Sequence, residues 1–217
     1  MAELIASDAE GFAEAHTTAL TGETAGIAAW TAANTPTPEM MSGLVEARLL
    51  EMLVVATGAR HVLEVGTFTG VGTLTMAAAL PAGGRVTTLE RDEAMGAVAR
   101  RHFGESPYAE RIELIVGDAV QTIAGLKGPF DVVYIDAAKV QYPDYYEGVL
   151  PKLAPRGVIV ADNLFRAGAT LDPAHTDAHT EGVRRFARRV QDDPRVHNAL
   201  LTVGDGLLMA WPAPDPG

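Results

Sequence analysis

Four polar side chains that could do chemistry stand directly after two apolar segments in the middle of the chain. Asp136 and Lys139 follow the first segment, and Asp162 and Asn163 follow the second. Both segments have the composition of buried parallel strands, whose carboxyl ends would bring these residues to one edge of a sheet. Carboxylate and amide oxygens suit a hard divalent cation, Mg²⁺ before Mn²⁺ or Ca²⁺, rather than zinc. The sequence therefore predicts a cation site at this edge.

These residues and two nearby histidines also have simpler interpretations. Asp162 and Asn163 could cap the turn that follows them, as such residues often do, and Lys139 could be an ordinary surface lysine. His175 and His179 stand four residues apart, a spacing found in zinc sites, yet no third ligand at a suitable spacing accompanies them. We therefore interpret the two histidines as polar residues of a surface segment.

Composition limits the classes of protein to which the chain could belong. Its 217 residues, 47% of them hydrophobic and 21% charged, can bury a full core, and we expect a single domain over residues 1–217. The formal net charge of -11 argues against a nucleic-acid partner. The chain has no cysteine, which excludes disulfides and thiolate metal sites. Without a long apolar run or a basic leader, we expect a soluble, cytoplasmic protein with no membrane partner.

Short apolar segments alternate with helical segments along the chain. This alternation is typical of a parallel α/β sheet with helices between the strands. The terminal VHNALLTV, the turn GDG and LLMAWP predict an antiparallel hairpin at the sheet edge, which brings the total to seven strands. The five apolar segments that predict buried parallel strands are HVLEV (61–65), RVTTLE (85–90), RIELIV (111–116), DVVYI (131–135) and GVIVA (157–161).

Further segments predict the elements around this sheet. Two helices are expected before the first strand, and in the second of them apolar residues recur at helical spacing from Met41 to Ala56. After the fifth strand, the Gly- and Pro-containing RAGATLDPAHTD predicts a mobile surface loop. The helix that follows this loop has a basic face, which we expect to be solvated and which consists of Arg184, Arg185, Arg188 and Arg189.

Three tyrosines follow Lys139 within one predicted helix. They could line an aromatic acceptor pocket, but packing of that helix against the sheet is the favoured role. The three are Tyr142, Tyr145 and Tyr146.

The first predicted strand leads into a glycine-rich turn, LEVGTFTGVGTLTM. Gly66, Gly70 and Gly72 would let backbone amides approach a ligand at the sheet edge, although the glycines alone suit either a dinucleotide or a nucleoside. Glu90, at the end of the second strand, can accept hydrogen bonds from the ribose hydroxyls of both NAD and S-adenosylmethionine (SAM). Glu64 would repel a diphosphate but attract the ammonium and sulfonium groups of SAM. The residues therefore favour SAM over NAD.

Five motifs occur in an order that resembles one family. LEVGTFTGVGTLTMAAAL, TTLERDE, VVYIDAAK, GVIVADN and VGDGLLMAW are similar to the motifs of the cation-dependent O-methyltransferases of the caffeoyl-CoA and catechol type. The similarity runs from about Met40 to Trp211. It implies a Rossmann-like class I methyltransferase fold with a seven-stranded, mostly parallel sheet and helices on both faces. It also implies a homodimer and a substrate pocket to which the N-terminal helices, residues 1–58, contribute.

The resemblance assigns roles to individual residues of this sequence. Asp136, Asp162 and Asn163 match the metal ligands, and Lys139 matches the proposed general base. Other residues match those that contact the methionine part, the ribose and the adenine of SAM in the family, and Asp136 is included among them as well. These cofactor residues are Ser42, Glu64, Gly66, Thr67, Gly72, Glu90, Asp118, Ala119 and Asp136.

The chain departs from the family pattern at three positions. Gly72 stands where the family often has serine, so that Thr73 would have to supply the hydroxyl contact to the SAM carboxylate. Ala138 replaces an aspartate of plant members at a position that varies within the family. Arg166 stands where some members have a tryptophan that forms a wall for the acceptor. The acceptor molecule is therefore left open.

The reaction implied is methyl transfer from SAM to one hydroxyl of a vicinal diphenol. Chelation by a dication lowers the pKa of the bound hydroxyl, and Lys139 would take up the proton. The phenolate would then attack the SAM methyl in line, with most of the rate gain from positioning. Two alternatives stand beside this one, an NAD-type oxidoreductase and a non-catalytic SAM-binding domain. The acceptor would be set by the loop around residues 166–177 and by the N-terminal helices.

Overall fold

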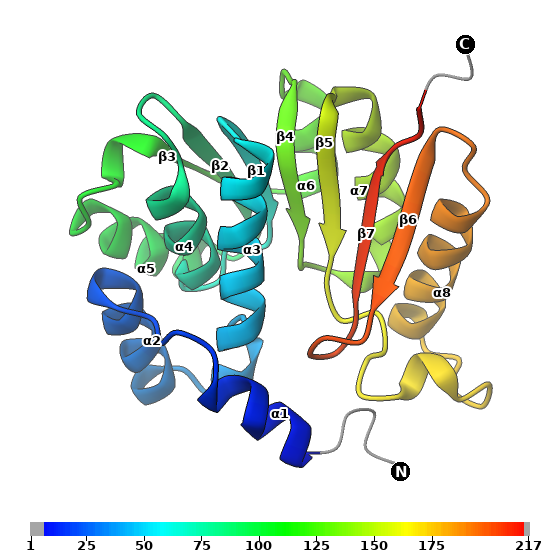
Figure 1. Ribbon diagram of the computed structural model, residues 1–217, viewed down its shortest axis with the longest axis horizontal. Coiled ribbons are helices and arrows are strands. Elements are labelled where there is room, and N and C mark those ends of the chain that lie inside the picture. Colours follow the sequence, from blue (N-terminus) through cyan, green and yellow to red (C-terminus); the bar gives the residue numbers. More distant parts are fainter. Residues whose placement is uncertain (1–6, 215–217) are drawn as a thin grey trace.

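A seven-stranded sheet runs through the part of the chain that the computed structural model describes, residues 7–214 (Figure 1). The strand order is β3-β2-β1-β4-β5-β7-β6, in which the first five neighbours are parallel and β7 is antiparallel to both β5 and β6. This arrangement confirms the predicted fold class, including the closing hairpin. The strands are β1 (His61–Val65), β2 (Arg85–Glu90), β3 (Ile112–Val116), β4 (Phe130–Ile135), β5 (Leu153–Ala161), β6 (Val196–Leu201) and β7 (Leu207–Pro212).

The five predicted parallel strands agree with the structure to within one residue, except at β5. The structure begins this strand at Leu153, four residues before the apolar segment that starts at Gly157. Leu153 pairs with Phe130 of β4, and the register shifts before Val132 pairs with Val158. Pro155 and an arginine in the early part of β5 are exposed, and they hide this part of the strand from a search for apolar residues.

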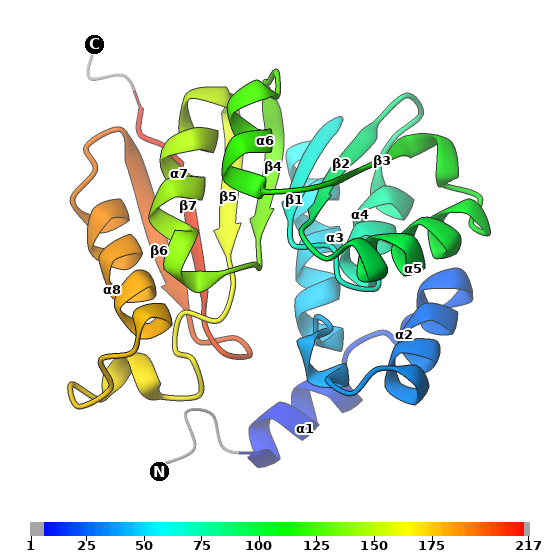
Figure 2. The ribbon, with the colours of Figure 1, turned by 180° about the vertical axis from the view of Figure 1, so that it is seen from behind.

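Helices cover both faces of the sheet, as predicted (Figure 2). Alternate strand residues point to opposite faces, so that Val62 and Val160 pack toward α3 and α4 while Leu63 and Ile159 pack toward α7 and α8. None of the described helices is long and apolar enough to cross a membrane. The helices are α1 (Ser7–Ala15), α2 (Gly22–Asn34), α3 (Leu44–Thr57), α4 (Val71–Ala79), α5 (Glu93–Gly104), α6 (Ala119–Gly125), α7 (Tyr142–Val149) and α8 (Ala178–Gln191).

Three helices, not the two predicted, precede β1 in the described part of the chain. The additional break lies before α2, where Gly22 has a φ of +57°. Only Thr24, Ile27 and Thr31 of α2 are buried, and two of these residues are threonines. A stripe with one aliphatic residue gives no clear helical periodicity, which explains why the sequence pattern did not separate this helix from the one before it.

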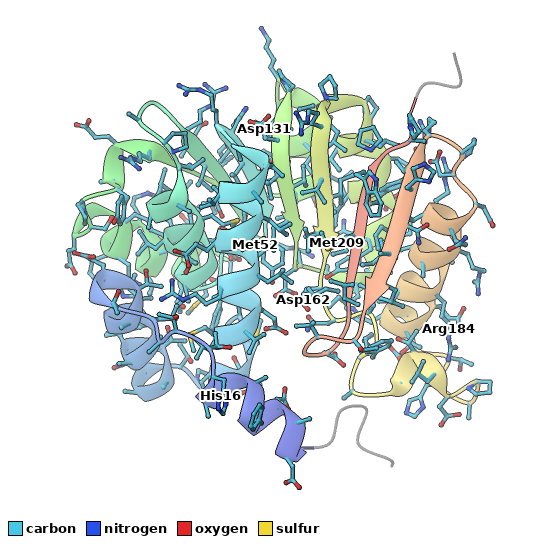
Figure 3. The ribbon with its side chains drawn as sticks, viewed as in Figure 1. His16, Met52, Asp131, Asp162, Arg184 and Met209 are labelled. Carbon is cyan, nitrogen blue, oxygen red and sulfur yellow. The ribbon has the colours of Figure 1, made fainter. Side chains whose placement is uncertain are left out.

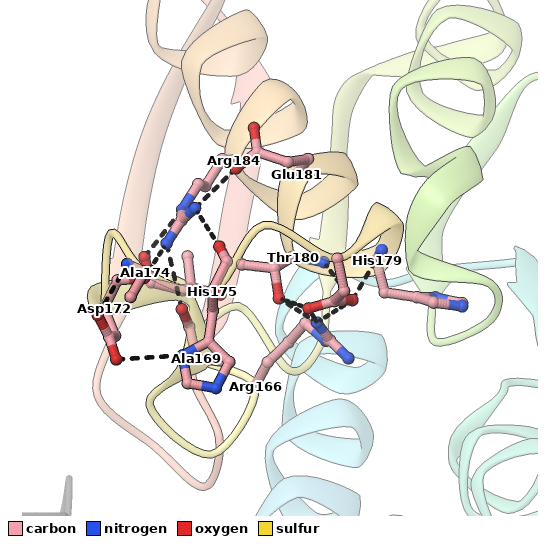
Figure 4. Close-up of polar contacts among 11 residues, drawn as sticks. Arg166, Ala169, Asp172, Ala174, His175, His179, Thr180, Glu181 and Arg184 are labelled. Atoms are coloured by element: carbon pink, nitrogen blue, oxygen red, sulfur yellow. Dashed lines mark hydrogen bonds and ion pairs between the residues drawn. The ribbon is translucent and has the colours of Figure 1, made fainter.

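The loop between β5 and α8 is fastened to α8 by Arg184 (Figure 4). Its guanidinium donates to the backbone carbonyls of Ala169, Thr170, Asp172 and His175, at distances from 2.5 to 3.2 Å. The prediction of a solvated arginine face is therefore wrong for Arg184, although Arg188 on the same helix is exposed. The reason is that helical periodicity shows which way a side chain points but not which loop folds over it.

The turn after β1 lies against the carboxyl end of β4. Gly66 has a φ of +107°, and a Cβ atom there would lie 2.1 Å from the carbonyl oxygen of Asp136. The Asp136 amide donates in turn to the Val65 carbonyl at 2.8 Å. Only glycine allows this approach, which brings the glycine-rich turn and the polar end of β4 into one site.

Replacement of Gly66 by a residue with a side chain should therefore lower the stability of the folded protein. We expect Gly66→Ala to lower the free energy of unfolding by about 2 to 4 kcal/mol, from backbone strain and the clash with Asp136. Gly26→Ala is the matched control, because Gly26 is helical and a Cβ atom there meets nothing within 4 Å. That variant should gain about 0.5 to 1 kcal/mol. Denaturant titration of both proteins measures the difference, and an unchanged midpoint for Gly66→Ala would contradict this account.

Candidate active site

A cavity of about 1070 Å³ lies at the carboxyl ends of β1, β2, β4 and β5. Every residue that the sequence predicted for the metal, the cofactor or catalysis lines it. Figure 3 shows Asp162 at this end of the sheet. Further parts of the wall come from residues 35–37 and 39–43, which connect α2 to α3, from Glu10 and Glu14 of α1, and from Gly204 and Asp205 between β6 and β7.

Lys139 lies between oxygens from two neighbouring strand ends. Its Nζ atom is 2.6 Å from Asp136 Oδ1 and 2.7 Å from Asn163 Oδ1, and it donates to the Tyr142 hydroxyl at 2.8 Å. The simpler interpretation of an ordinary surface lysine does not fit, because 15% of this side chain is exposed. The ammonium group therefore marks a position at which the Asp136 and Asn163 oxygens converge on one cation.

Asp162 is the most deeply buried member of the predicted metal set, with 2% of its surface exposed. Its Oδ2 accepts from the Tyr134 hydroxyl at 2.7 Å and its Oδ1 from the Asn163 amide at 2.6 Å. The second contact is the local turn contact that a capping role would give. Burial, reinforced by Asp136 and Glu46, raises the pKa of Asp162 to about 7. A cation beside this carboxylate would offset that penalty.

The donor set fits a hard divalent cation better than zinc. Among the described residues, no group of three or more His, Cys, Asp or Glu side chains is placed to hold a metal ion. The predicted set instead combines two carboxylates with the amide of Asn163, which is oxygen chemistry suited to Mg²⁺. His175 lies in the loop before α8 and His179 in the first turn of α8, and their side chains point in different directions (Figure 4). Both are exposed, as expected for surface residues.

Glu64 lies in the other half of the cavity with 1% of its surface exposed. Its Oε2 accepts hydrogen bonds from the hydroxyls of Thr73 and Thr88, the latter at 2.5 Å. Burial is the largest cause that raises the pKa of Glu64 to about 8, and the two hydroxyls oppose that shift. The Thr73 hydroxyl therefore donates to Glu64. The sequence had suggested a different role for it, a contact to the SAM carboxylate in place of the hydroxyl missing at Gly72.

Two further carboxylates are oriented by backbone amides. Glu90 accepts from the amides of Phe68, Arg91 and Asp92, each at 2.8 Å, which leaves part of its acceptor capacity for a ligand. Asp118 caps α6 by accepting from the Gln121 amide at 3.0 Å. The fold thus fixes both carboxylates before any ligand is bound.

Sequence reasoning missed several residues of this site, among them a tyrosine of β4 and a glutamate of α3. Tyr134 is fully buried in β4 and holds Asp162, and Glu46 of α3 lies against the turn between β6 and β7. A Cβ atom at Gly204 would lie 1.8 Å from the Glu46 carboxylate, so this turn closes directly onto α3. Tyr134 stands inside an apolar strand motif, and only its register two residues before Asp136 marks it as facing the same side.

The predicted roles of the tyrosines and of the β5–α8 loop can now be compared with the structure. Tyr142 and Tyr146 pack edge-on against Phe186, with ring centroids 5.5 and 5.9 Å away, which confirms the packing role, whereas Tyr145 lines the cavity. None of residues 166–177 lines the cavity. Arg166 instead donates to Asp177 at 3.0 Å.

Comparison with known proteins decides the family. The model of a family described as O-methyltransferase matches residues 22–211. The chain belongs to this O-methyltransferase family. The resemblance seen in the five motifs is thereby confirmed, and membership of this family decides against an NAD-type oxidoreductase.

Relatives within the family are similar over most of their length. The chain is 36% identical to a catechol O-methyltransferase of Niastella koreensis over 174 residues, which cover 76% of this chain and 79% of that protein. It is also 36% identical to a catechol O-methyltransferase of Mycobacterium tuberculosis over 180 residues, 80% and 81% of the two chains. An O-methyltransferase from Bacillus cereus, solved in complex with S-adenosylhomocysteine (SAH), superposes with a TM-score of 0.86 at 32% identity, over 95% and 97% of the chains.

The buried Glu64 makes stability depend on pH. Below pH 4.5 this carboxyl group is protonated in both states, but between 4.5 and about 8 only the folded state keeps the proton. The folded protein then binds more protons than the unfolded chain, so stability falls as the pH rises through this window.

We expect this fall to be smaller in Glu64→Gln. Denaturant titrations of both proteins at pH 5, 7 and 9 measure the free energy of unfolding. Asp162 contributes a fall of the same sign in both proteins, so subtracting one pH dependence from the other leaves the contribution of Glu64. Equal loss of stability in the two proteins would show that Glu64 titrates normally.

Proposed function

We propose that this O-methyltransferase transfers the methyl group of SAM to one hydroxyl of a vicinal diphenol, with the help of a divalent cation. The observation that carries the proposal is a single cavity lined by Glu64 and Glu90 of β1 and β2 and by Asp162 and Asn163 after β5. Strand β4 lies between β1 and β5, and Lys139 contacts both Asp136 at its end and Asn163. The names of the catechol O-methyltransferases among its relatives support the acceptor class. The SAH-bound relative supports the donor.

The donor half would hold the cationic methionine part and the ribose of SAM. Glu64 is buried and forms no ion pair with a basic residue in the described part of the chain, so an ammonium group placed beside it would stabilise its charged form. Glu90, oriented by three amides, would accept from the ribose hydroxyls. Asp118 and Ala119 at the start of α6 would border the adenine, and residues 66–67 and 72 would leave room for the methionine part.

The acceptor half would hold the two diphenol oxygens next to Lys139. A divalent cation bound by Asp136, Asp162 and Asn163 would orient these oxygens and lower the pKa of the hydroxyl. Lys139 in its neutral form would accept the hydroxyl proton, and Tyr142 would hold its Nζ atom in place. The methyl group then passes from sulfur to oxygen, which leaves a neutral thioether. Lys139 would have no such purpose in a non-catalytic SAM-binding domain.

The metal requirement can be tested with one variant and its control. We expect EDTA to abolish methyl transfer to catechol and Mg²⁺ to restore it, because the acceptor oxygens lose the charge that orients them. Asp162→Ala should lose at least about 100-fold in kcat/KM. Asp172→Ala is the control, since Asp172 lies in the loop outside the cavity. Undiminished transfer in EDTA, or by Asp162→Ala, would refute the metal role.

The acceptor end of the cavity is acidic. Besides Asp92, which caps α5, five carboxylates line the cavity in addition to those of the donor and metal sets, and within residues 7–214 none of these five forms an ion pair. Such a field favours a cationic substituent on the acceptor and disfavours an anionic one. The five are Glu10, Glu14, Glu39, Glu46 and Asp205.

We therefore expect a catechol amine to be a better acceptor than a catechol carboxylate. The ratio of their kcat/KM values should fall roughly 5-fold or more in Glu10→Gln/Glu14→Gln, which keeps shape and removes two charges. Dopamine and caffeate are suitable probes at low salt. A ratio that the double variant leaves unchanged would show that these glutamates do not select the acceptor.

We further propose that residues 1–217 act as one domain, that the protein works in the cytoplasm and that two copies form a homodimer. A groove of about 380 Å³ between α3 and β7 supports the last point. Met209 of β7 lines this groove, and Figure 3 labels it together with Met52 of α3. Met52 and Trp211 are 49% and 39% exposed, so this face offers apolar area to a second copy. The mass of the native protein in solution tests the dimer.

A further inference from the structure

The N-terminal helix α2 contacts the glycine-rich turn from outside the sheet. The hydroxyl oxygens of Thr31 and Thr69 lie 2.8 Å apart, and both residues are fully buried. The Thr31 hydroxyl also lies 2.8 Å from the Ile27 carbonyl. One hydroxyl carries one proton, so Thr31 donates either to Thr69 or to the Ile27 carbonyl, and in the second case Thr69 donates to Thr31. The two hydroxyls therefore depend on each other.

The same residue of the turn is also held by α5. His102 Nδ1 lies 2.9 Å from the Thr69 carbonyl oxygen, and His102 is buried. The His102 ring packs edge-on against Trp30 of α2 at 4.9 Å, and the Arg101 guanidinium lies over the Trp30 ring at 5.2 Å. Helices α2 and α5 thus contact each other and both hold Thr69.

Thr69 is next to the residues that border the donor half of the cavity. Thr67 shares a hydrogen bond with Thr88 at 2.6 Å, and the Phe68 amide donates to Glu90 at 2.8 Å. Phe68 has a φ of +51°, a conformation that costs free energy and persists only where its neighbours fix it. A shift of Thr69 would therefore change how Thr67 and Glu90 face a donor.

Helix α2 also continues into the wall of the acceptor half. Thr35 caps the end of α2, since its hydroxyl donates to the Thr31 carbonyl at 2.8 Å. Residues 35–37 and 39–43 line the cavity. One helix therefore touches both the donor turn and the acceptor wall.

We infer that Thr31 is a positioning residue that couples donor binding to the docking of α2. The inference rests on the proposed donor. A donor bound at the turn would hold Thr69 in the position from which it forms its hydrogen bond with Thr31. This hydrogen bond would in turn stabilise the docking of α2 and of the acceptor wall that continues from it. Coupling between two equilibria is reciprocal: if donor binding stabilises docked α2, docked α2 strengthens donor binding by the same factor. Loss of the Thr31 hydroxyl should reduce both effects equally.

SAH is the probe for the test, because it offers the donor's contacts without reacting. We expect Thr31→Val to bind SAH roughly 5- to 30-fold more weakly in calorimetry, since it leaves the buried Thr69 hydroxyl unpaired. Thr31→Ser restores the hydroxyl and should bind within about 2-fold of the wild type. Thr75→Val is the matched control, because Thr75 is a buried helical threonine whose hydroxyl meets only the Val71 carbonyl.

Hydrogen exchange separates coupling from a general loss of stability. In the wild type, SAH should slow amide exchange in residues 22–34, and in Thr31→Val this protection should be smaller. The inference would be overturned if Thr31→Val bound SAH as tightly as the wild type, or if Thr75→Val lost as much SAH affinity as Thr31→Val. Wild-type exchange in α2 that SAH leaves unchanged would also overturn it, a result that decides even if Thr31→Val fails to fold. A wild type that does not bind SAH would refute the donor assignment itself.

Discussion

The architecture of this site depends on how the protein accommodates carboxylates at a buried sheet edge. Glu64 and Asp162 are 1% and 2% exposed, and Asp136 lies between them at the end of β4. Burial of charge without a partner is expensive. Among the described residues, the ammonium group of Lys139 is the one basic group within ion-pair distance of this set, and it contacts Asp136. The charge of the remaining two carboxylates is not neutralised by the chain itself.

Hydroxyl groups form most of the side-chain hydrogen bonds to Glu64 and Asp162. Thr73 and Thr88 donate to Glu64, and Tyr134 donates to Asp162. A hydroxyl satisfies the hydrogen-bonding capacity of a carboxylate and fixes its direction, but it adds no positive charge. The raised pKa values of Glu64 and Asp162 reflect this arrangement. We expect a site built in this way to favour cationic ligands, which would supply the positive charge that the hydroxyls lack.

Much of this arrangement can be predicted from the sequence, because parallel strands carry strong local signals. The segment HVLEV coincides with β1, and Asp136 and Asp162 follow β4 and β5 directly, so their common edge follows from topology alone. Residue types at strand ends also identify the two halves of the site. The family motifs then predict which carboxylate belongs to which half.

Other features arise from contacts between segments far apart in the chain, which no local pattern records. The hydrogen bond from Tyr134 to Asp162 requires the register of β4 against β5. Arg184 looks like a surface residue until the loop before α8 folds over it. The N-terminal helix α2 has a weak apolar stripe, and its docking depends on polar contacts with Thr69 and on Trp30.

Proton release on ligand binding tests most directly whether the buried carboxylates are completed by cationic ligands. SAH titrated into the protein at pH 7, in buffers of different ionisation enthalpy, gives the number of protons released. Because the pKa of Glu64 is raised to about 8, this carboxyl group is mostly protonated before binding, and the ammonium group of SAH should ionise it. The account predicts that the wild type releases up to about one proton more than Glu64→Gln. Equal proton counts for the two proteins would contradict it.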